Sequence, residues 1–393
     1  MKDLKITVTS AFGIEGLLRR EMNRLGYQDG LAVGKGGVTL MGELADVARL
    51  NLWIRQGERV VIEMGCFPAT TFEELFQGVK AIPWEEWMGA DASFPVTGKS
   101  IKSALFSVPD CQSIVKKAIV ERLREKYRGV SWFAETGPLY HVDFKITNDV
   151  ATVVLDTTGE GLHKRGWRKL AYAAPLKETL AAVMLTLSNW RPNQPLIDPF
   201  CGSGTIPIEA ALKAINAAPG LGRSFACESW PQLAPGLWQD LRQEAREAIV
   251  SRPDLRIEGY DINEQALSMA RYHAKLAGVE DKIHFQRRDV ADFKSSRKYG
   301  AIITNPPYGE RLGEEKEAAE LYRLMGQVFK PLDTWSFYIL TSHKGFEEAF
   351  GRKATKNTKL FNSWLECRLY QFHGPRPPKA PAPAEAGGAA AGE

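Results

Sequence analysis

Hydrophobic and polar positions in the C-terminal half of the chain follow two alternating patterns. Short apolar runs, which predict buried parallel strands, occur at residues 195–200, 257–263, 282–286 and 301–304. Apolar positions at helical spacing, which predict helices after the first and second of these strands, occur at residues 206–215 and 265–277. Strands that alternate with helices predict an α/β domain, and such domains bind ligands beyond the carboxyl ends of their strands.

The N-terminal part contains shorter elements of both kinds. Strands are predicted at residues 5–9, 37–40, 140–146 and 150–155, and helices at residues 13–26, 44–53 and 112–127. The first elements favour a small α+β, ferredoxin-like unit over residues 1–60. Near the other end, residues 365–372 predict a closing strand. The Pro-, Ala- and Gly-rich tail over residues 374–393 lacks apolar periodicity and predicts disorder.

The tetrapeptide Asn305-Pro306-Pro307-Tyr308 directly follows the strand predicted at 301–304. Prolines lack an N–H and cannot continue a strand, so Asn305 and Tyr308 are presented at its carboxyl edge. The Asn305 side-chain oxygen and a proline carbonyl can accept hydrogen bonds from one NH2 group, while the Tyr308 ring stacks on the plane that carries it. An ordinary turn is the plainer interpretation of Asn-Pro. Motifs at the other strand ends favour a ligand site.

A glycine turn, Cys201-Gly202-Ser203-Gly204-Thr205, follows the strand that ends near Asp198. Strand, glycine turn and helix together bring backbone N–H groups close to a cofactor. Proline at position 207 excludes the dinucleotide fingerprint, and the absence of Gly-Lys-Ser/Thr excludes a P-loop. Because Asp198 would repel a phosphate, the turn favours a cationic, amino-bearing cofactor.

Two further acids follow the next two predicted strands. Asp261 stands where α/β nucleoside binders hold ribose hydroxyls, and Asp289 could bond an adenine amino group. The long gap between Gly204 and Asp261 indicates an insertion over about residues 217–255. Asp is also common in helix caps and turns, but acids at successive strand ends favour a nucleoside-bearing cofactor.

These motifs resemble those of S-adenosylmethionine-dependent methyltransferases that act on exocyclic or amide nitrogen. The residues that narrow the resemblance are Asn305-Pro306-Pro307-Tyr308-Gly309-Glu310-Arg311-Leu312, Gly161-Leu162-His163-Lys164-Arg165-Gly166-Trp167-Arg168 and Ala174-Pro175-Leu176-Lys177-Glu178-Thr179-Leu180. They are similar to the THUMP-domain methyltransferases that make N2-methylguanosine in RNA, especially the bacterial 23S ribosomal RNA enzymes. The resemblance covers about residues 1–373. It implies a Rossmann-like class I methyltransferase domain at 165–373, preceded by the ferredoxin-like unit at 1–60 and a THUMP RNA-binding domain at 61–164.

The resemblance also implies a set of site residues, with S-adenosyl-L-methionine as cofactor. The implied catalytic residues are Asn305, Pro306 and Tyr308. The implied cofactor-binding residues are Asp198, Phe200, Cys201, Gly202, Gly204, Thr205, Asp261, Ile262, Asp289, Val290 and Asn305. Lys177 and Thr179 lie in a stretch that the resemblance places over the cofactor. Cys201 is interpreted as a packing residue rather than a nucleophile, because no base can be named beside it.

The predicted chemistry follows from the target amine. An exocyclic nitrogen of guanine or adenine is a poor nucleophile, because its lone pair is delocalised into the ring. Hydrogen bonds to Asn305 Oδ1 and the Pro306 carbonyl would make this nitrogen more tetrahedral and aim its lone pair at the methyl group. A paired base cannot reach such a pocket, so the target must be single-stranded or flipped out.

Composition excludes several other classes. A length of 393 residues with 44% hydrophobic content predicts two or three packed domains. Five scattered cysteines without a C-x-x-C pair, and six histidines without metal-site spacing, argue against a zinc site and fit a reducing cytosol. The chain shows neither a signal-peptide pattern nor a membrane-length apolar run, so a cytoplasmic protein without metal or membrane contact is expected.

The net charge of +4 says little about nucleic acid, but charge is concentrated locally. Residues 97–130 contain eight basic side chains against three acids. A solvated helix face is the ordinary meaning of such a run, whereas a surface that tracks phosphates is favoured beside a nucleobase site. The segment also resembles the core of a THUMP domain. The expected RNA-binding residues are Lys99, Lys102, Lys116, Lys117, Arg124 and Arg128.

Four alternatives remain open. A transfer RNA guanine-N2 methyltransferase is separated from a ribosomal RNA enzyme only by resemblance. A DNA adenine-N6 methyltransferase uses the same tetrapeptide, but the basic N-terminal half and the absence of a recognisable DNA-reading helix count against it. Glutamine-N5 methylation of a protein leaves the basic helix without a role. A ribosome-assembly factor that only binds RNA would not need intact cofactor motifs. The modified nucleotide, the oligomeric state and the role of residues 1–60 stay open.

Overall fold

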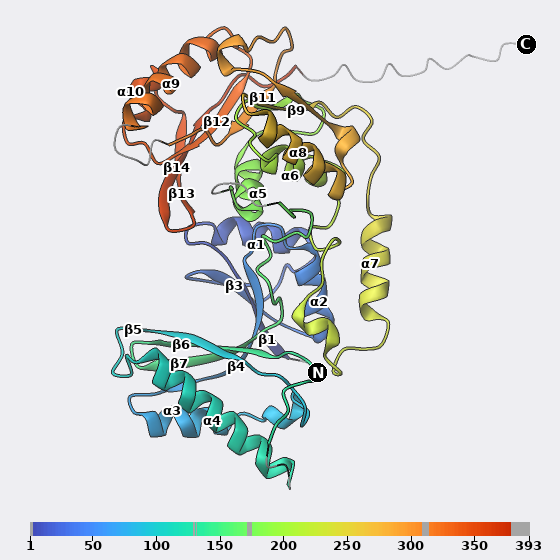
Figure 1. Cartoon of the computed structure of the whole chain (residues 1–393), viewed down its shortest axis with the longest axis vertical. Helices are drawn as coiled ribbons and strands as arrows, with labels where there is room; N and C mark the ends of the chain where they lie inside the picture. The colour runs from blue at the N-terminus through green and yellow to red at the C-terminus, as the bar shows by residue number, and fades with distance from the viewer. Residues whose placement is uncertain (1–2, 129, 131, 171–174, 309–313, 379–393) are drawn as a thin grey trace, which may run out of the picture.

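The computed structural model describes residues 3–128, 130, 132–170, 175–308 and 314–378, arranged around two seven-stranded sheets. Figure 1 shows the C-terminal sheet and its helices at the top, the first 60 residues below them, and residues 61–156 at the bottom. Parts of three predicted segments lie outside the described residues, namely 309–312, Ala174 and the tail from 379.

The C-terminal sheet has the strand order β10-β9-β8-β11-β12-β14-β13. Its strands are β8 (Leu196–Asp198), β9 (Ile257–Asp261), β10 (Ile283–Arg287), β11 (Ala301–Thr304), β12 (Ser336–Thr341), β13 (Lys356–Asn362) and β14 (Leu365–Phe372). The first five in this order are parallel, and β14 runs antiparallel to both of its neighbours. The strand order reverses between β8 and β11, which is where open α/β sheets bind ligands. This arrangement is the predicted Rossmann-like fold.

Helices cover both faces of this sheet. These helices are α5 (Glu178–Leu187), α6 (Thr205–Ala214), α8 (Glu264–Leu276), α9 (Glu314–Phe329) and α10 (Phe346–Phe350), whereas α7 (Leu237–Glu247) packs on the N-terminal half. Successive residues of β11 point to opposite cores, because Ala301 and Ile303 pack with α5, α6 and α8, whereas Ile302 packs with α9 and α10. Burial on both faces explains why β11 reads as a continuous apolar run rather than an alternating one.

The N-terminal sheet has the strand order β2-β3-β1-β4-β7-β6-β5. Its elements are β1 (Leu4–Thr9), α1 (Glu15–Arg24), β2 (Ala32–Gly34), β3 (Gly37–Gly42), α2 (Leu44–Trp53), β4 (Arg59–Pro68), α3 (Phe72–Lys80), β5 (Val96–Ile101), α4 (Val108–Lys126), β6 (His141–Thr147) and β7 (Val150–Asp156). Strand β4 pairs with β1 through residues 59–62 and with β7 through residues 61–68. The first 60 residues and the segment after them therefore share one sheet.

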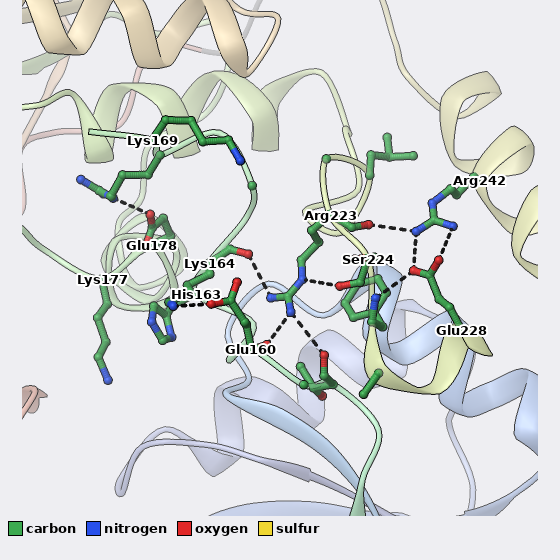
Figure 2. Close-up of a pocket in the computed structure, with 18 of the residues that line it drawn as sticks. Glu160, His163, Lys164, Lys169, Lys177, Glu178, Arg223, Ser224, Glu228 and Arg242 are labelled. Carbon is green, nitrogen blue, oxygen red and sulfur yellow. Dashed lines mark hydrogen bonds and ion pairs between the residues drawn. The ribbon is translucent and has the colours of Figure 1, made fainter. Parts of the chain in front are cut away.

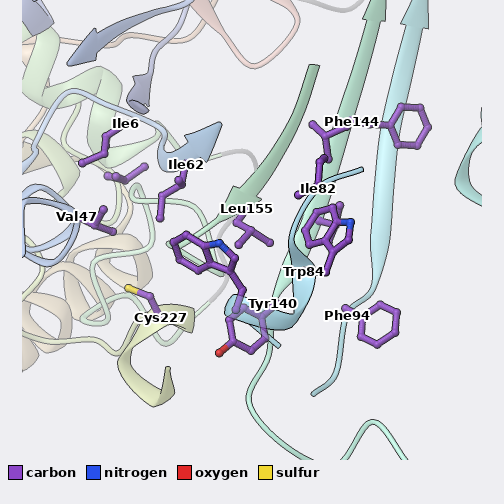
Figure 3. Packing of buried hydrophobic residues seen from close by; sticks show 14 of the residues in the cluster. Ile6, Val47, Ile62, Ile82, Trp84, Phe94, Tyr140, Phe144, Leu155 and Cys227 are labelled. Atoms are coloured by element: carbon purple, nitrogen blue, oxygen red, sulfur yellow. The ribbon is translucent and has the colours of Figure 1, made fainter. Parts of the chain in front are cut away.

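One hydrophobic core runs beneath this whole sheet. Figure 3 shows Ile6 and Val47 from the first 60 residues and Trp84, Tyr140 and Phe144 from the following segment within this core. Cys227, from the predicted insertion, belongs to the same core. The N-terminal half is thus one packed body to which the C-terminal domain contributes.

The insertion predicted at residues 217–255 links the two sheets. Trp230 stacks on Tyr140 with ring centroids 4.7 Å apart, and its indole N–H donates to the carbonyl of Leu139 over 2.8 Å. Gln232 donates to the carbonyl of Trp87 at 2.6 Å. Helix α7 packs on α2. The two carboxylate oxygens of Glu244 in α7 each accept a hydrogen bond from the guanidinium of Arg49 in α2. These contacts fix the N-terminal body relative to the C-terminal domain.

A buried ion cluster strengthens this junction. The Arg165 side chain, 1% exposed, pairs with the fully buried Glu209 of α6 at 3.2 Å. Arg165 also donates to the carbonyl of Arg55 at 2.5 Å, and Arg55 in turn donates to the carbonyl of Ala217 at 2.5 Å. Removing one partner would leave an uncompensated buried charge, which costs several kcal/mol, roughly 3–5.

Helix α4 differs from its prediction at both ends. It begins at Val108 rather than 112, because a proline in the first turn of a helix loses no hydrogen bond there. It ends at Lys126, so the expected RNA-binding residue Arg128 lies beyond its end. Among the described residues, none of the helices combines the length and apolarity that a bilayer crossing demands.

Candidate active site

The carboxyl ends of β8, β9 and β11 meet at one edge of the C-terminal sheet. Asp198 ends β8, Asp261 ends β9, and Asn305 directly follows β11. The backbone N–H of Gly202 donates to Asp261 Oδ2 at 2.9 Å, and the N–H of Cys201 donates to the carbonyl of Tyr260 at 2.9 Å. The structure therefore brings the glycine turn and the first two predicted acids together.

Asp198 is almost fully buried at the centre of this edge. Its Oδ1 accepts a hydrogen bond of 2.6 Å from the Thr304 hydroxyl and one of 3.2 Å from the backbone N–H of Phe200. Burial raises the pKa of Asp198 to about 7, although both hydrogen bonds act to lower it, and the nearby Asp261 raises it further. A positive group bound above Asp198 would favour the ionised carboxylate.

The glycine turn has a backbone conformation that favours glycine. Gly202 has φ +51° and Gly204 has φ +86°, both in the left-handed region. A Cβ at Gly204 would lie 3.0 Å from the Cβ of Ala270 in α8, so the turn also packs closely against that helix. Among the described residues other than its two chain neighbours, none has a heavy atom within 4 Å of a Cβ placed on Gly202, which leaves open space above the turn.

Arg168 holds the other side of the glycine turn. Its guanidinium donates to Ser203 Oγ at 3.0 Å and to Thr205 Oγ1 at 2.8 Å. A third bond, from Nε to Glu178 Oε1 at 2.8 Å, ties the turn to the start of α5. The sequence analysis assigned no role to Arg168, although its family-like segment contains it. Arg168 positions the two hydroxyl residues of the turn.

The residues after β9 and β10 suit a nucleoside. Asp261 Oδ1 accepts the backbone N–H of Asn263 at 2.9 Å, so both of its oxygens are oriented by the backbone. Ile262 is 63% exposed, an apolar surface beside an acid that fits an adenosine group. Asp289 is exposed and caps the short helical turn that begins at Val290 by accepting from Ala291 N–H at 2.9 Å. The donor set is therefore compatible with S-adenosylmethionine.

The Asn-Pro-Pro-Tyr turn is fixed from two sides. The Tyr322 hydroxyl of α9 donates to the carbonyl of Pro307 at 2.8 Å. The Tyr308 hydroxyl donates to Asn305 Oδ1, and it also interacts with the side chains of Asn362 and Cys367. Burial, with a smaller effect of Cys367, raises the pKa of Tyr308. Sequence reasoning missed Tyr322, because α9 was not predicted.

Cys201 has the environment of a packing residue. It is 6% exposed, and burial raises the pKa of its thiol well above the usual value, with a further contribution from Asp198. A protonated thiol is a weak nucleophile. All five cysteines are free thiols.

The predicted RNA-binding residues lie on or just after β5 and α4, which are far from the catalytic turn (Figure 1). Lys99, Lys102, Lys117 and Arg128 are exposed. Lys116 pairs with Glu135 at 2.6 Å, and Arg124 pairs with Glu121 at 3.3 Å. These carboxylates partly neutralise the positive charge that the two side chains offer to a ligand. The structure does not bring these residues and the catalytic turn together, so one RNA would have to span both.

A second basic region lines a cavity of about 1240 Å³ where the two sheets join (Figure 2). The charged side chains that line it are Lys164, Arg168, Lys169, Lys177, Arg223 and Arg242, with Glu160, Glu178 and Glu228. Arg223 donates to the carbonyls of Gly161, Lys164, Thr158 and Glu160, which fixes its position. Burial, followed by the effect of nearby cations such as Lys177, lowers the pKa of His163 to about 4. Sequence reasoning did not single out this region as a basic surface.

Comparison with known protein families accounts for most of the chain. Residues 165–371 match the RMKL-like methyltransferase domain, residues 69–156 the THUMP domain and residues 5–61 the RlmL ferredoxin-like domain. These matches agree with the predicted resemblance and with the predicted order of the three folds.

Full-length relatives agree with these matches. The chain is 46% identical over 373 residues to Putative RNA methyltransferase YpsC from Bacillus subtilis, covering 95% of this chain and 96% of that protein. It is 35% identical over 382 residues to Ribosomal RNA large subunit methyltransferase K/L from Syntrophotalea carbinolica, covering 94% of this chain and 53% of that protein. The chain thus spans about half the length of this second relative.

A solved structure shows a similar arrangement with a ligand. The structure, described as "SMU.472, a putative methyltransferase complexed with SAH", superposes with a TM-score of 0.91 at 43% sequence identity. The match covers 96% of this chain and all of that chain. The predicted cofactor is thereby supported by a relative that holds S-adenosylhomocysteine.

Proposed function

Since the chain belongs to the RMKL-like methyltransferase family and is an S-adenosylmethionine-dependent RNA methyltransferase, we propose that it methylates the exocyclic N2 of a guanosine in 23S ribosomal RNA. The observation that carries the choice of an amine is the Asn305-Pro306-Pro307-Tyr308 turn at the end of β11, beside the buried Asp198. Its acceptors suit an NH2 group, and its aromatic ring suits the planar base that carries this group.

The cofactor would lie over the glycine turn. In this proposal Asp198 and the Gly202–Gly204 turn hold its methionine part, Asp261 holds the ribose, and Asp289 holds the adenine. Bound there, S-adenosylmethionine supplies an electrophilic methyl group. The surrounding residues that complete this proposed site are Phe200, Cys201, Thr205, Ile262 and Val290.

Asn305 and Pro306 activate the target nitrogen by orienting it. Oδ1 of Asn305 and the Pro306 carbonyl would accept its two N–H groups, so the lone pair leaves conjugation with the ring and forms the new N–C bond, while the bond from the methyl group to sulfur breaks and leaves a neutral thioether. The nitrogen becomes positively charged and then loses one proton to solvent, so no base needs to remove a proton beforehand. The acceleration comes mainly from positioning, which can contribute roughly 7–11 kcal/mol to a well-oriented reaction.

The Tyr308 hydroxyl is bonded to Asn305 Oδ1, the acceptor atom that the target amine needs. Because this hydroxyl is the donor, the incoming amine must replace its hydrogen bond. The displaced Tyr308 ring then stacks on the base, an interaction worth about 1–3 kcal/mol. Exchange of one donor for another keeps Asn305 satisfied before and after the base enters.

One observation supports an RNA substrate, and a second supports ribosomal RNA. The THUMP domain and the exposed cations Lys99, Lys102 and Lys117 offer a surface for phosphates at a distance from the catalytic turn. The relative from Syntrophotalea carbinolica is named as a ribosomal RNA large subunit methyltransferase. We retain residues 1–60, 61–164 and 165–373 as the proposed ferredoxin-like, THUMP and methyltransferase domains.

The proposal is tested by identifying the methylated nucleoside. The purified protein is incubated with methyl-labelled S-adenosylmethionine and unmodified 23S ribosomal RNA, transfer RNA or DNA, and the products are digested to nucleosides for mass spectrometry. Label in N2-methylguanosine from 23S ribosomal RNA is the expected result. Label confined to transfer RNA would refute the ribosomal substrate, and label in N6-methyladenine would refute the guanine target.

A further inference from the structure

The β13–β14 hairpin carries a large apolar side chain at its tip. Asn362 pairs with Leu365, so Ser363 and Trp364 form a two-residue turn, with Ser363 at φ +59°. The Trp364 side chain is 83% exposed. Tryptophan side chains are usually buried over most of their surface. The exposure of Trp364 is therefore unusual, and the surroundings of the hairpin should account for it.

The catalytic turn adjoins this hairpin. The Tyr308 hydroxyl interacts with Asn362 at the end of β13 and with Cys367 in β14. Tyr308 and Leu365 also pack against the same hydrophobic core. Trp364 lies two residues from Asn362 and one from Leu365 in the chain, so the exposed indole belongs to the same hairpin that contacts Tyr308, the residue proposed to stack on the target base.

The hairpin and the residues just before it are rich in exposed cations, and Lys359 and Arg368 share one face of the hairpin. Five exposed cations occur between residues 351 and 368, namely Arg352, Lys353, Lys356, Lys359 and Arg368, whereas Glu366 is the one acid in this range. Lys359 and Arg368 stand directly opposite each other on neighbouring strands, an arrangement of like charges that is unfavourable by itself. Glu366 pairs with Lys359 at 2.6 Å and also interacts with the charge of Arg368, whose guanidinium donates to Asn357 Oδ1 at 2.9 Å.

We propose that the β13–β14 hairpin is a second RNA-contact surface, on which Trp364 stacks against a base next to the methylated nucleotide. Lys359 and Arg368, which share one face of the hairpin, contact the phosphates that follow. A flipped or unpaired target leaves its neighbours with an unstacked face, and an aromatic ring compensates for that loss with any base. This inference rests on the proposed function, because it needs RNA at the catalytic turn.

The first test uses Trp364→Ala and Trp364→Phe. We expect Trp364→Ala to lower kcat/KM on 23S ribosomal RNA by roughly 5- to 150-fold, the range that base–aromatic stacking gives. Trp364→Phe should recover most of this loss, and the affinity for S-adenosylhomocysteine should be unchanged in both variants. Trp132→Ala is the matched control, because Trp132 is equally exposed at 82% but lies in the N-terminal half.

A direct readout separates stacking from a general loss of binding. A short single-stranded RNA carries one guanosine with 2-aminopurine beside it and is bound in the presence of S-adenosylhomocysteine. Trp364 should quench the 2-aminopurine fluorescence, and Trp364→Ala should restore it while Trp132→Ala leaves it quenched. Equal quenching in the wild type and Trp364→Ala would overturn the stacking role.

The basic face is tested by charge reversal. The double variant Lys359→Glu, Arg368→Glu should reduce the slope of log affinity against log salt by about 1.4, as expected for two lost contacts to single-stranded RNA. Lys275→Glu, Lys330→Glu changes the net charge equally at exposed positions outside the hairpin. Equal slopes for these two double variants would refute the RNA-contact surface. A wild-type enzyme that leaves guanosine N2 unmethylated would instead refute the proposed function.

Discussion

The buried Asp198 predicts that cofactor binding is linked to proton release. Its pKa lies near 7 in the ligand-free protein, because burial penalises the charged carboxylate. The group is then neutral in most molecules at pH 6. A cationic cofactor held above Asp198 favours the ionised form, so a proton leaves when the cofactor binds.

The size of the effect follows from the ionised fraction. With a pKa of about 7, roughly one tenth of the molecules carry an ionised Asp198 at pH 6, and about nine tenths do so at pH 8. If the cofactor binds the ionised form, its apparent Kd falls about 10-fold over this range. The stability of the ligand-free protein changes in the opposite sense. The pKa of Asp198 is higher in the folded protein than in the unfolded chain, where it is near 4. Below pH 4 this difference therefore contributes at most roughly 4 kcal/mol to the free energy of unfolding, and the contribution is lost as the pH rises through 7.

Two variants separate Asp198 from other titrating groups. Asp198→Asn should bind S-adenosylmethionine more weakly and with little pH dependence below pH 7.5, and any remaining dependence reports the ligand's own amino group, whose usual pKa is about 7.7–8.0. Thr304→Val removes the 2.6 Å hydrogen bond that lowers the pKa of Asp198. It should therefore shift the midpoint of the affinity profile to higher pH.

The assay is isothermal titration of S-adenosylmethionine from pH 6 to pH 8 in buffers of different ionisation enthalpy, which reports the protons released. Wild type should release close to one proton near pH 6, and Asp198→Asn should release close to none. An affinity that is flat with pH in the wild type, or unchanged proton release in Asp198→Asn, would refute the assignment of Asp198 beneath the cofactor.

Four further expectations follow. Asn305→Ala should abolish methyl transfer and leave S-adenosylmethionine affinity nearly intact, and normal turnover in this variant would contradict the mechanism. Tyr308→Phe should retain most of kcat/KM because the ring remains, whereas Tyr308→Ala should lose roughly 5- to 150-fold; equal losses would contradict the stacking role. Arg168→Met should lower the free energy of unfolding by about 3–5 kcal/mol, because Glu178 is left buried without its partner, and chemical denaturation should show that adding Glu178→Gln restores part of this loss. Charge reversal at Lys117 and Arg124 should weaken RNA binding and lower its salt slope without affecting the cofactor, and an unchanged slope would return α4 to a solvated face.

The helices and strands that were predicted correctly are those whose limits are marked by nearby residues in the sequence. The limits of β11, α2 and β14 agree with their predicted ranges, since a proline pair, a helical apolar stripe or an uninterrupted β pattern marks each one. Helix α7 was missed because Leu241 and Ala245 are its only buried residues, so its apolar stripe is narrow. Strand β5 was missed because its alternating residues are polar and it contains Gly98, where a Cβ would lie 2.4 Å from the ring of Phe144.

In the candidate site, too, some residues could be predicted from local sequence patterns and others could not. The acids and the glycine turn could be found because each follows a strand in the sequence, and parallel strands end at one edge. The bond from Thr304 to Asp198, the contacts of Arg168 with the glycine turn and the hydroxyl of Tyr308 on Asn305 all depend on tertiary placement. A sequence pattern contains no information on which of many arginines reaches a given hydroxyl.

The position of β4 limits where this protein can be cut into fragments that still fold. Because β4 pairs with β1 on one side and β7 on the other, an excised fragment that matched only the THUMP family, residues 69–156, would lack it. Strand β7 would then become an open edge with a row of unpaired N–H and C=O groups, which invites aggregation between chains. The two N-terminal folds should unfold in one cooperative step, and proteolysis at residue 69 should release no folded RNA-binding module.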